Sequence, residues 1–136
     1  MRANCGVMNP QLLHWNLVFA WGWIVLGFAS GVVLGLFFHR EAWLGGYGSW
    51  KRRLYRLGHI SFFGLGFANL LFWVTARLLP SAPASLDVAS RSFLLGGVTM
   101  PLCCLLAAHF KPARHLFAIP VISLLVAGVV TFLGIL

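Results

Sequence analysis

Five histidines are the side chains through which this chain could bind a cofactor. A b-type haem in a helix bundle needs two axial histidines, on different helices and at similar depth. Four of the five lie at the ends of apolar segments that we expect to share one membrane level: His39, His59, His109 and His115. His14 lies at the opposite level and has no imidazole partner there.

His59 is the strongest ligand candidate. It lies about one helical turn inside an apolar segment, and Gly66 and Asn69 follow it on the same helical face. A glycine on that face would let a porphyrin edge approach the backbone. Haem b, if bound, is therefore expected to use His59 with His109 or His39. The alternative is that each histidine lies at a membrane interface, where water or headgroups solvate it.

Other chemistry is sparse in this sequence. The only two acidic residues, Glu41 and Asp87, fall at opposite ends of the expected helices and cannot act as a catalytic pair. No apolar segment carries the embedded carboxylate that proton-coupled exporters use. Cys103 and Cys104 are adjacent and form no CxxC redox motif. We predict no catalytic residue and no metal site, and an enzyme is not the favoured class.

The composition places these residues in a membrane. Hydrophobic residues make up 60% of the 136 residues, charged residues make up 9%, and the mean hydropathy is +0.91. A bilayer span needs about 20 apolar residues. Four segments meet this length: 12–38, 54–79, 92–110 and 116–136. The connectors are too short for a soluble domain, so we predict one all-α membrane domain over residues 1–136, an antiparallel bundle of four transmembrane helices.

Lys and Arg are concentrated on one side of the predicted membrane. Arg2, Arg77 and Arg91 lie on one side, and the loops after the first and third segments hold the others: Arg40, Lys51, Arg52, Arg53, Arg56, Lys111 and Arg114. Short cytoplasmic loops are enriched in Lys and Arg. The pattern therefore predicts that both basic loops are inside and both termini outside, in a multi-pass protein of the bacterial inner membrane.

Cations and aromatic rings are interleaved in the first basic loop. The cations are Lys51, Arg52, Arg53 and Arg56, and the rings are Trp43, Tyr47, Trp50 and Tyr55. Such a loop is typical of the headgroup level, where each cation attracts anionic lipid by about 1 kcal/mol. We therefore expect anionic headgroups as its partner, and no nucleic acid, despite the formal net charge of +8.

Small residues recur at four-residue intervals on the first two helices. Gly27, Gly31 and Gly35 form such a stripe on the first, and Gly64 and Ala68 lie at the same spacing on the second. Small-xxx-small faces let helix backbones approach closely in lipid. We expect these faces to pack on one another. The alternative is that the first stripe contacts a second copy of the chain or another subunit.

Two segments resemble a known family. "GHISFFGLGF" at residues 58–67, and less closely "HWNLVFAWGW" at residues 14–23, are similar to the His-x-(Asn/Ser)-apolar-apolar-Gly openings of spans in small proteins related to the haem-copper oxidase core subunit. The resemblance covers two of the four helices. It implies a haem or metal ligand role for His59, with His14 as the less close match. Adjacent histidines and a proton-channel acid are missing, so it implies no oxidase activity.

Three functional hypotheses follow. The favoured one is an accessory or structural membrane subunit that associates through helix packing, as a homo-oligomer or within a larger membrane complex. The second is a haem-binding electron-transfer or quinone-linked membrane subunit that uses His59. The third is a small-solute channel or transporter lined by Asn16, Ser30 and Asn69.

Overall fold

The chain is described here by a computed structural model that covers residues 6–136. Within this range the structure is helical and contains no strand, apart from one isolated bridge between Val7 and Pro83. The long helices are α1 (Pro10–Phe38), α2 (Trp50–Leu78), α3 (Leu86–His109) and α4 (Ala118–Ile135), and two 3₁₀ segments, Trp43–Gly45 and Lys111–Phe117, lie in the connectors. Four helical segments are long and apolar enough to cross a membrane, as predicted.

The third helix begins six residues before the predicted start at residue 92. Hydropathy alone misses this first part because Asp87 and Ser90 interrupt the apolar run. Leu86 and Ala89 are nevertheless buried against neighbouring segments, and Asp87 Oδ1 accepts a hydrogen bond from the Asn9 backbone N at 2.9 Å. Tertiary contacts thus support the first turns of α3.

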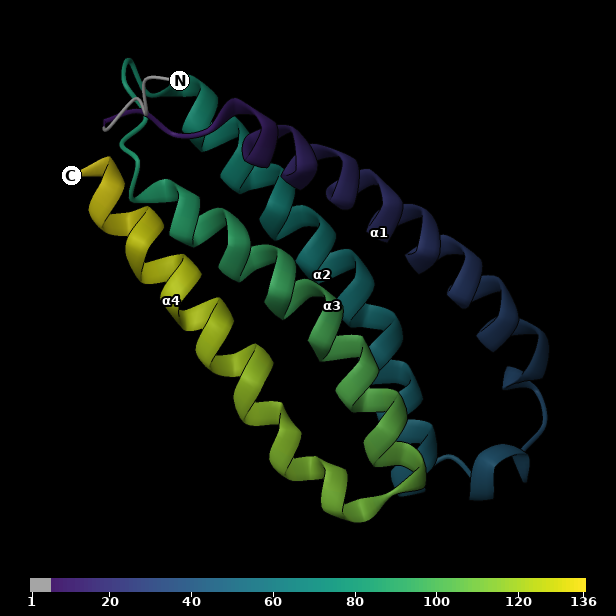
Figure 1. Cartoon of the computed structure of the whole chain (residues 1–136). Helices are drawn as coiled ribbons and strands as arrows, with labels where there is room; N and C mark the ends of the chain where they lie inside the picture. Colours follow the sequence, from purple (N-terminus) through teal and green to yellow (C-terminus); the bar gives the residue numbers. More distant parts are fainter. Residues whose placement is uncertain (1–5) are drawn as a thin grey trace.

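The helices lie side by side along their lengths (Figure 1). Consecutive helices pack on one another, and α1 also contacts α3. The start of α1 and the end of α4 lie at one end of the molecule, and the connectors from α1 to α2 and from α3 to α4 lie at the other end (Figure 1). The first turns of α2 and the two connectors that contain Arg40, Lys111 and Arg114 therefore lie toward the same end.

Local sequence explains the helix starts and the first connector. Asn9 caps α1 by accepting from Gln11 N, and Ser49 caps α2 by accepting from Arg52 N, as short polar side chains do at helix N-termini. Between the two helices the chain passes through left-handed backbone at Leu44 (φ 55°) and the two glycines that follow it. Glycine adopts this conformation without steric cost, which allows the tight loop.

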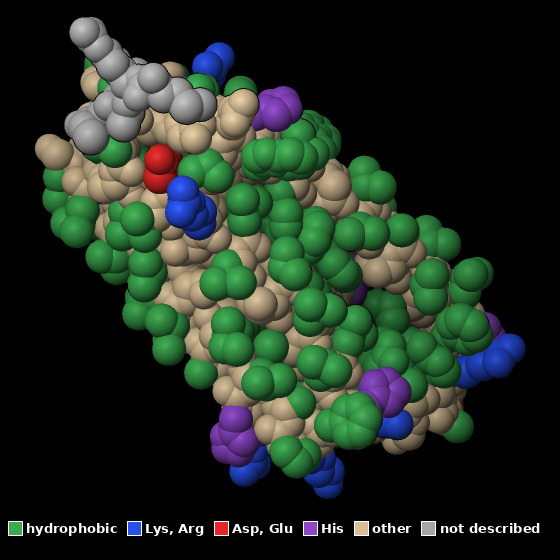
Figure 2. Space-filling view, viewed as in Figure 1, with side chains coloured by type: hydrophobic (Ala, Val, Ile, Leu, Met, Phe, Trp, Pro, Cys, Tyr) green, Lys and Arg blue, Asp and Glu red, His purple; other side chains and the backbone are tan. Residues whose placement is uncertain are grey.

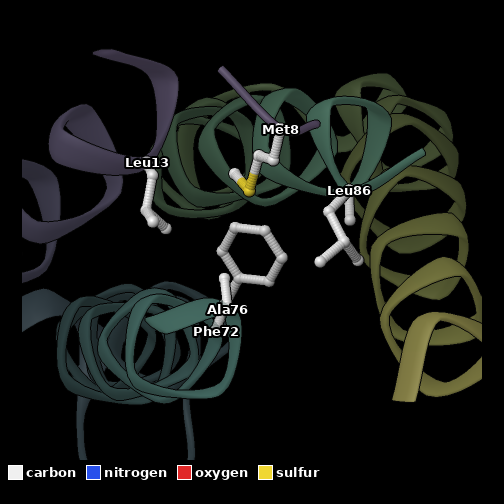
Figure 3. Close-up of a cluster of buried hydrophobic side chains, with 6 residues drawn as sticks. Met8, Leu13, Phe72, Ala76 and Leu86 are labelled. Carbon is white, nitrogen blue, oxygen red and sulfur yellow. The ribbon is translucent and has the colours of Figure 1, made fainter. Parts of the chain in front are cut away.

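A buried apolar cluster holds the end of the molecule where the termini lie. Met8, Leu13, Phe72, Ala76 and Leu86 converge there from the segment before α1 and from α1, α2 and α3 (Figure 3). Backbone pairing supports the cluster, because the Met8 N–H donates to the Ala82 carbonyl at 2.9 Å. The connector between α2 and α3 is thereby joined to the segment that precedes α1.

Much of the remaining apolar surface faces outward. Large side chains such as Phe28, Leu71 and Leu125 are each 66% exposed at widely separated places on three helices. In the space-filling view, hydrophobic side chains extend along the molecule while Lys, Arg and His gather toward its ends (Figure 2). This surface suits a lipid environment, where exposed apolar side chains carry no hydrophobic penalty.

Candidate ligand pocket beside His59

His59 lies half-buried on α2, between α1 and α3. Its Nδ1 is 2.9 Å from the Ser30 hydroxyl of α1, and its ring contacts Phe63 edge-on with centroids 5.5 Å apart. The absence of a side chain at Gly31 makes room for the imidazole, since a Cβ there would stand 3.0 Å from His59 Cε1. The glycine stripe on α1 and the histidine on α2 therefore fit one another.

A cavity of about 310 Å³ adjoins this imidazole. Its lining is mainly apolar, including Leu34 and Phe62, and the residues with polar side-chain atoms among those that line it are Ser30, Trp43, Tyr55 and His59. This volume lies at the lower end of the usual range for small-molecule sites, which are mostly apolar with a few fixed polar groups. The cavity can therefore hold a ring-sized amphipathic ligand.

The wall on α3 is shaped by a proline. Pro101 lines the cavity and lacks the N–H that would bond the Gly97 carbonyl one turn earlier. The indole Nε1 of Trp23 on α1 donates to that carbonyl at 3.0 Å. An interhelical hydrogen bond thus replaces the missing helical one and fixes α1 against α3 near the site.

The Ser30 hydroxyl lies within hydrogen-bond distance of both the Gly27 carbonyl and His59 Nδ1, and its choice between them decides the tautomer of His59. Ser30 has one hydroxyl proton, and its Oγ lies 3.0 Å from the Gly27 carbonyl, which can only accept. With that proton donated to Gly27, Ser30 Oγ accepts from the Nδ1–H of His59. In a neutral imidazole this leaves Nε2 as a hydrogen-bond acceptor, so a ligand that binds there should supply a hydroxyl or another donor.

The other histidines have different surroundings. His109 is exposed, and its Nε2 lies 3.0 Å from the Tyr55 hydroxyl. His39 is an exposed residue at the end of α1, and His115 is exposed in the segment before α4. His14 is exposed at the other end of α1 and lines a different, shallow cavity with Trp15. Of the five histidines, only His59 lines the 310 Å³ cavity.

Haem binding by His59 with His109 or His39 stays a prediction. The cavity supplies one of the two axial imidazoles, and Tyr55 engages the Nε2 of His109. Within residues 6–136, no group of three or more His, Cys, Asp or Glu side chains is arranged to hold a metal ion. The geometry favours an organic ligand with a hydrogen-bonding head.

The two amides expected to line a channel, Asn16 and Asn69, take part in a buried hydrogen-bond network. Asn16 of α1 and Asn69 of α2 are both 0% exposed, and Asn16 Nδ2 donates to Asn69 Oδ1 at 2.8 Å. Ser90 of α3 donates its hydroxyl to Asn16 Oδ1, and Asn69 Nδ2 donates to the Leu65 carbonyl at 2.9 Å. The network joins three helices, and its polar groups are engaged with one another.

Some of the small residues predicted to form the helix contact lie against the neighbouring helix, and others have no neighbouring atom near them. A Cβ at Gly27 would stand 2.8 Å from the Phe63 ring, so Gly27 and Gly31 both lie against side chains of α2. Gly35 and Gly64 have no atom within 4 Å of such a Cβ. Ala68 is half-buried on α2. Gly66 lies directly against the backbone of α1, because a Cβ built on it would stand 3.0 Å from the Ala20 carbonyl oxygen.

No known protein family, curated protein or solved structure matches this chain. The site must therefore be judged on its own geometry. Sequence reasoning selected His59, but it assigned Ser30 to a channel and treated Trp43 and Tyr55 as interface aromatics. Residue spacing within one helix could not show that Ser30 lies opposite His59, because that depends on the register between α1 and α2.

Proposed function

We propose that this chain is a small accessory subunit of a membrane complex, folded as an antiparallel bundle with both termini outside. The proposed membrane is the bacterial inner membrane, with the two basic loops on the cytoplasmic side. Support comes from the four long apolar helices and from the Lys and Arg of the two connectors and of the first turns of α2, which lie at one end (Figure 1).

Within this role, we propose that the cavity beside His59 binds a quinol head group. The observation that carries this proposal is the pairing of His59 Nδ1 with Ser30 inside an otherwise apolar cavity. A quinol is a ring with hydroxyl donors and an apolar tail, and it is soluble in the bilayer that surrounds the cavity. The acceptor Nε2 of His59 would bind one hydroxyl, and the apolar walls would hold the ring.

Binding in a detergent-solubilised preparation tests the proposal. The probes are a short-chain benzoquinol, the matching quinone, and the quinol dimethyl ether, which has the same ring but no hydroxyl donor. We expect the quinol to bind tightest under anaerobic conditions. His59→Phe should weaken quinol binding by about three- to tenfold, which corresponds to the loss of one hydrogen bond.

Two further variants make this result interpretable. His115→Phe removes an exposed histidine outside the cavity and should leave the affinity unchanged. Ser30→Ala removes the group that fixes the tautomer, so the preference for quinol over quinone should fall. Equal binding of the three probes would contradict the proposal, as would equal effects of His59→Phe and His115→Phe. A sharp reduced band in the visible spectrum of the purified protein would instead favour haem.

A further inference from the structure

Arg52 is a buried cation at the end of the molecule that carries the basic loops. It is 2% exposed, whereas the neighbouring Lys51 and Arg53 are exposed. Its Nη2 donates to the Phe38 carbonyl at 2.9 Å and its Nη1 to the Glu41 carbonyl at 3.4 Å. Its Nε has no hydrogen-bond partner within residues 6–136. The sequence predicted that Lys51, Arg52, Arg53 and Arg56 all contact lipid headgroups. The structure separates Arg52 from the others because its side chain is buried.

The charge of Arg52 is only partly compensated by these contacts. Its polar partners are two backbone carbonyls and not a carboxylate, and aromatic rings surround it, with the guanidinium 4.7 Å from the Phe38 centroid and 5.3 Å from that of Tyr47. Ring faces attract a cation, but a buried charge is costly unless it is paired. A nearby anion would therefore be stabilised.

A groove runs from this cation along the outer face of α1 and α2. It has a volume of about 350 Å³, and Arg52 and Arg56 line one part of it. The half-buried Arg56 lies over the Tyr47 ring at 4.6 Å, so both guanidinium groups share one aromatic neighbour. This part of the groove therefore places two guanidinium charges together, both of them at least partly shielded from solvent.

The rest of the groove is lined mainly by apolar side chains and glycines, with His59 beside them. Gly31 and Gly35 form its floor on α1, and the 63% exposed Ile60 borders it on α2. Nothing lies within 4 Å of a Cβ built on Gly35, so this part of the glycine stripe is open space and not a helix contact. In a membrane, the acyl chains of neighbouring lipids would contact the open surface at Gly35.

We propose that this groove binds one anionic phospholipid, with its phosphate at Arg56 in the field of Arg52 and one acyl chain along Gly31 and Gly35. Charge complementarity commits the site to an anionic lipid, because a zwitterionic headgroup would place a third positive charge beside the two arginines. The inference rests on the membrane placement and not on quinol binding. His59 borders both cavities, so the test leaves His59 unchanged.

Native mass spectrometry of the full chain tests the site. The protein is released from micelles that contain equal amounts of phosphatidylglycerol and phosphatidylcholine, without quinol, and the first bound lipid is counted. We expect the wild type to retain phosphatidylglycerol preferentially. Arg56→Gln should reduce that preference about fivefold, as expected for one cation at a headgroup. Arg53→Gln changes the net charge equally, but on an exposed side chain, and should have little effect.

A second pair of variants tests the acyl-chain part. Gly35→Leu adds an apolar side chain in the open part of the groove and keeps both arginines, and it should reduce retention of the first lipid. Gly128→Leu adds the same side chain at another open glycine, on α4, and should not. Equal losses with Arg56→Gln and Arg53→Gln would overturn the proposal in favour of diffuse surface charge. If excess inorganic phosphate displaces the lipid and Gly35→Leu has no effect, the site binds a free anion and the lipid proposal is wrong.

Discussion

The pair formed by Asn16 and Asn69 shows how single polar residues stabilise this fold. Both side chains are fully buried, and each supplies a group that the other or Ser90 engages. In an apolar interior, an amide without a partner costs more than a satisfied amide gains. The pair should therefore matter for helix association and not for solute passage.

Asn69→Leu should lower the free energy of unfolding by about 1–3 kcal/mol, because it leaves Asn16 Nδ2 without its 2.8 Å partner. The double variant Asn16→Leu with Asn69→Leu should lose less than the sum of the two single losses. Unfolding of the purified protein in mild detergent measures both effects. Thr131→Val is the control, since the Thr131 hydroxyl bonds within α4 to the Ala127 carbonyl. Strictly additive losses would contradict the coupling.

At the scale of helices, the glycine positions decide how closely α1 and α2 approach. Gly66 and Gly64 are two residues apart on α2, yet their surroundings differ. A Cβ at Gly66 would meet the Ala20 carbonyl at 3.0 Å and Ile24 Cγ1 at 3.1 Å, whereas a Cβ at Gly64 meets nothing within 4 Å. The helix contact therefore depends on one of these glycines and not on the other.

Gly66→Ala should destabilise the protein by about 1–3 kcal/mol, because the backbone of α1 must move to admit the methyl group. Gly64→Ala should be neutral or stabilising by up to about 1 kcal/mol, since alanine favours the helix and the position is open. Thermal unfolding in one detergent compares the two variants. The predicted packing is wrong if Gly64→Ala is the more damaging substitution.

At the scale of the whole molecule, the two ends differ in charge. Seven of the ten Lys and Arg lie in the connector from α1 to α2, in the first turns of α2 and in the connector from α3 to α4. These segments lie together at one end of the molecule (Figure 1). Short loops rich in Lys and Arg stay on the cytoplasmic side during insertion. This end is therefore the one we expect inside the cell.

Single cysteines at residues 48 and 81 should be labelled from opposite sides of the membrane. Gly48→Cys lies in the basic connector and Ser81→Cys in the connector between α2 and α3. In a background without Cys5, an impermeant thiol reagent should label residue 81 in intact cells and residue 48 only after lysis. Cys103 and Cys104 are buried and contribute little labelling. Labelling of residue 48 in intact cells would refute the proposed orientation.

Membrane-span length and overall composition could be read from the sequence because they depend only on local hydropathy. Four segments of sufficient length were predicted, and four were found, although hydropathy alone missed the first turns of α3. His59 was selected because its neighbours at helical spacing mix a glycine and an amide. These features follow from the order of residues along one helix.

The partners of each side chain required the tertiary structure, because they depend on how neighbouring helices are rotated and shifted. The sequence could not show that Ser30 lies 2.9 Å from His59, or that Gly35 opens into a groove while Gly31 contacts an imidazole. Nor could it distinguish the buried Arg52 from the exposed Arg53 beside it. Each of these facts is a relation between residues on different segments, and helical periodicity carries no information about register between helices.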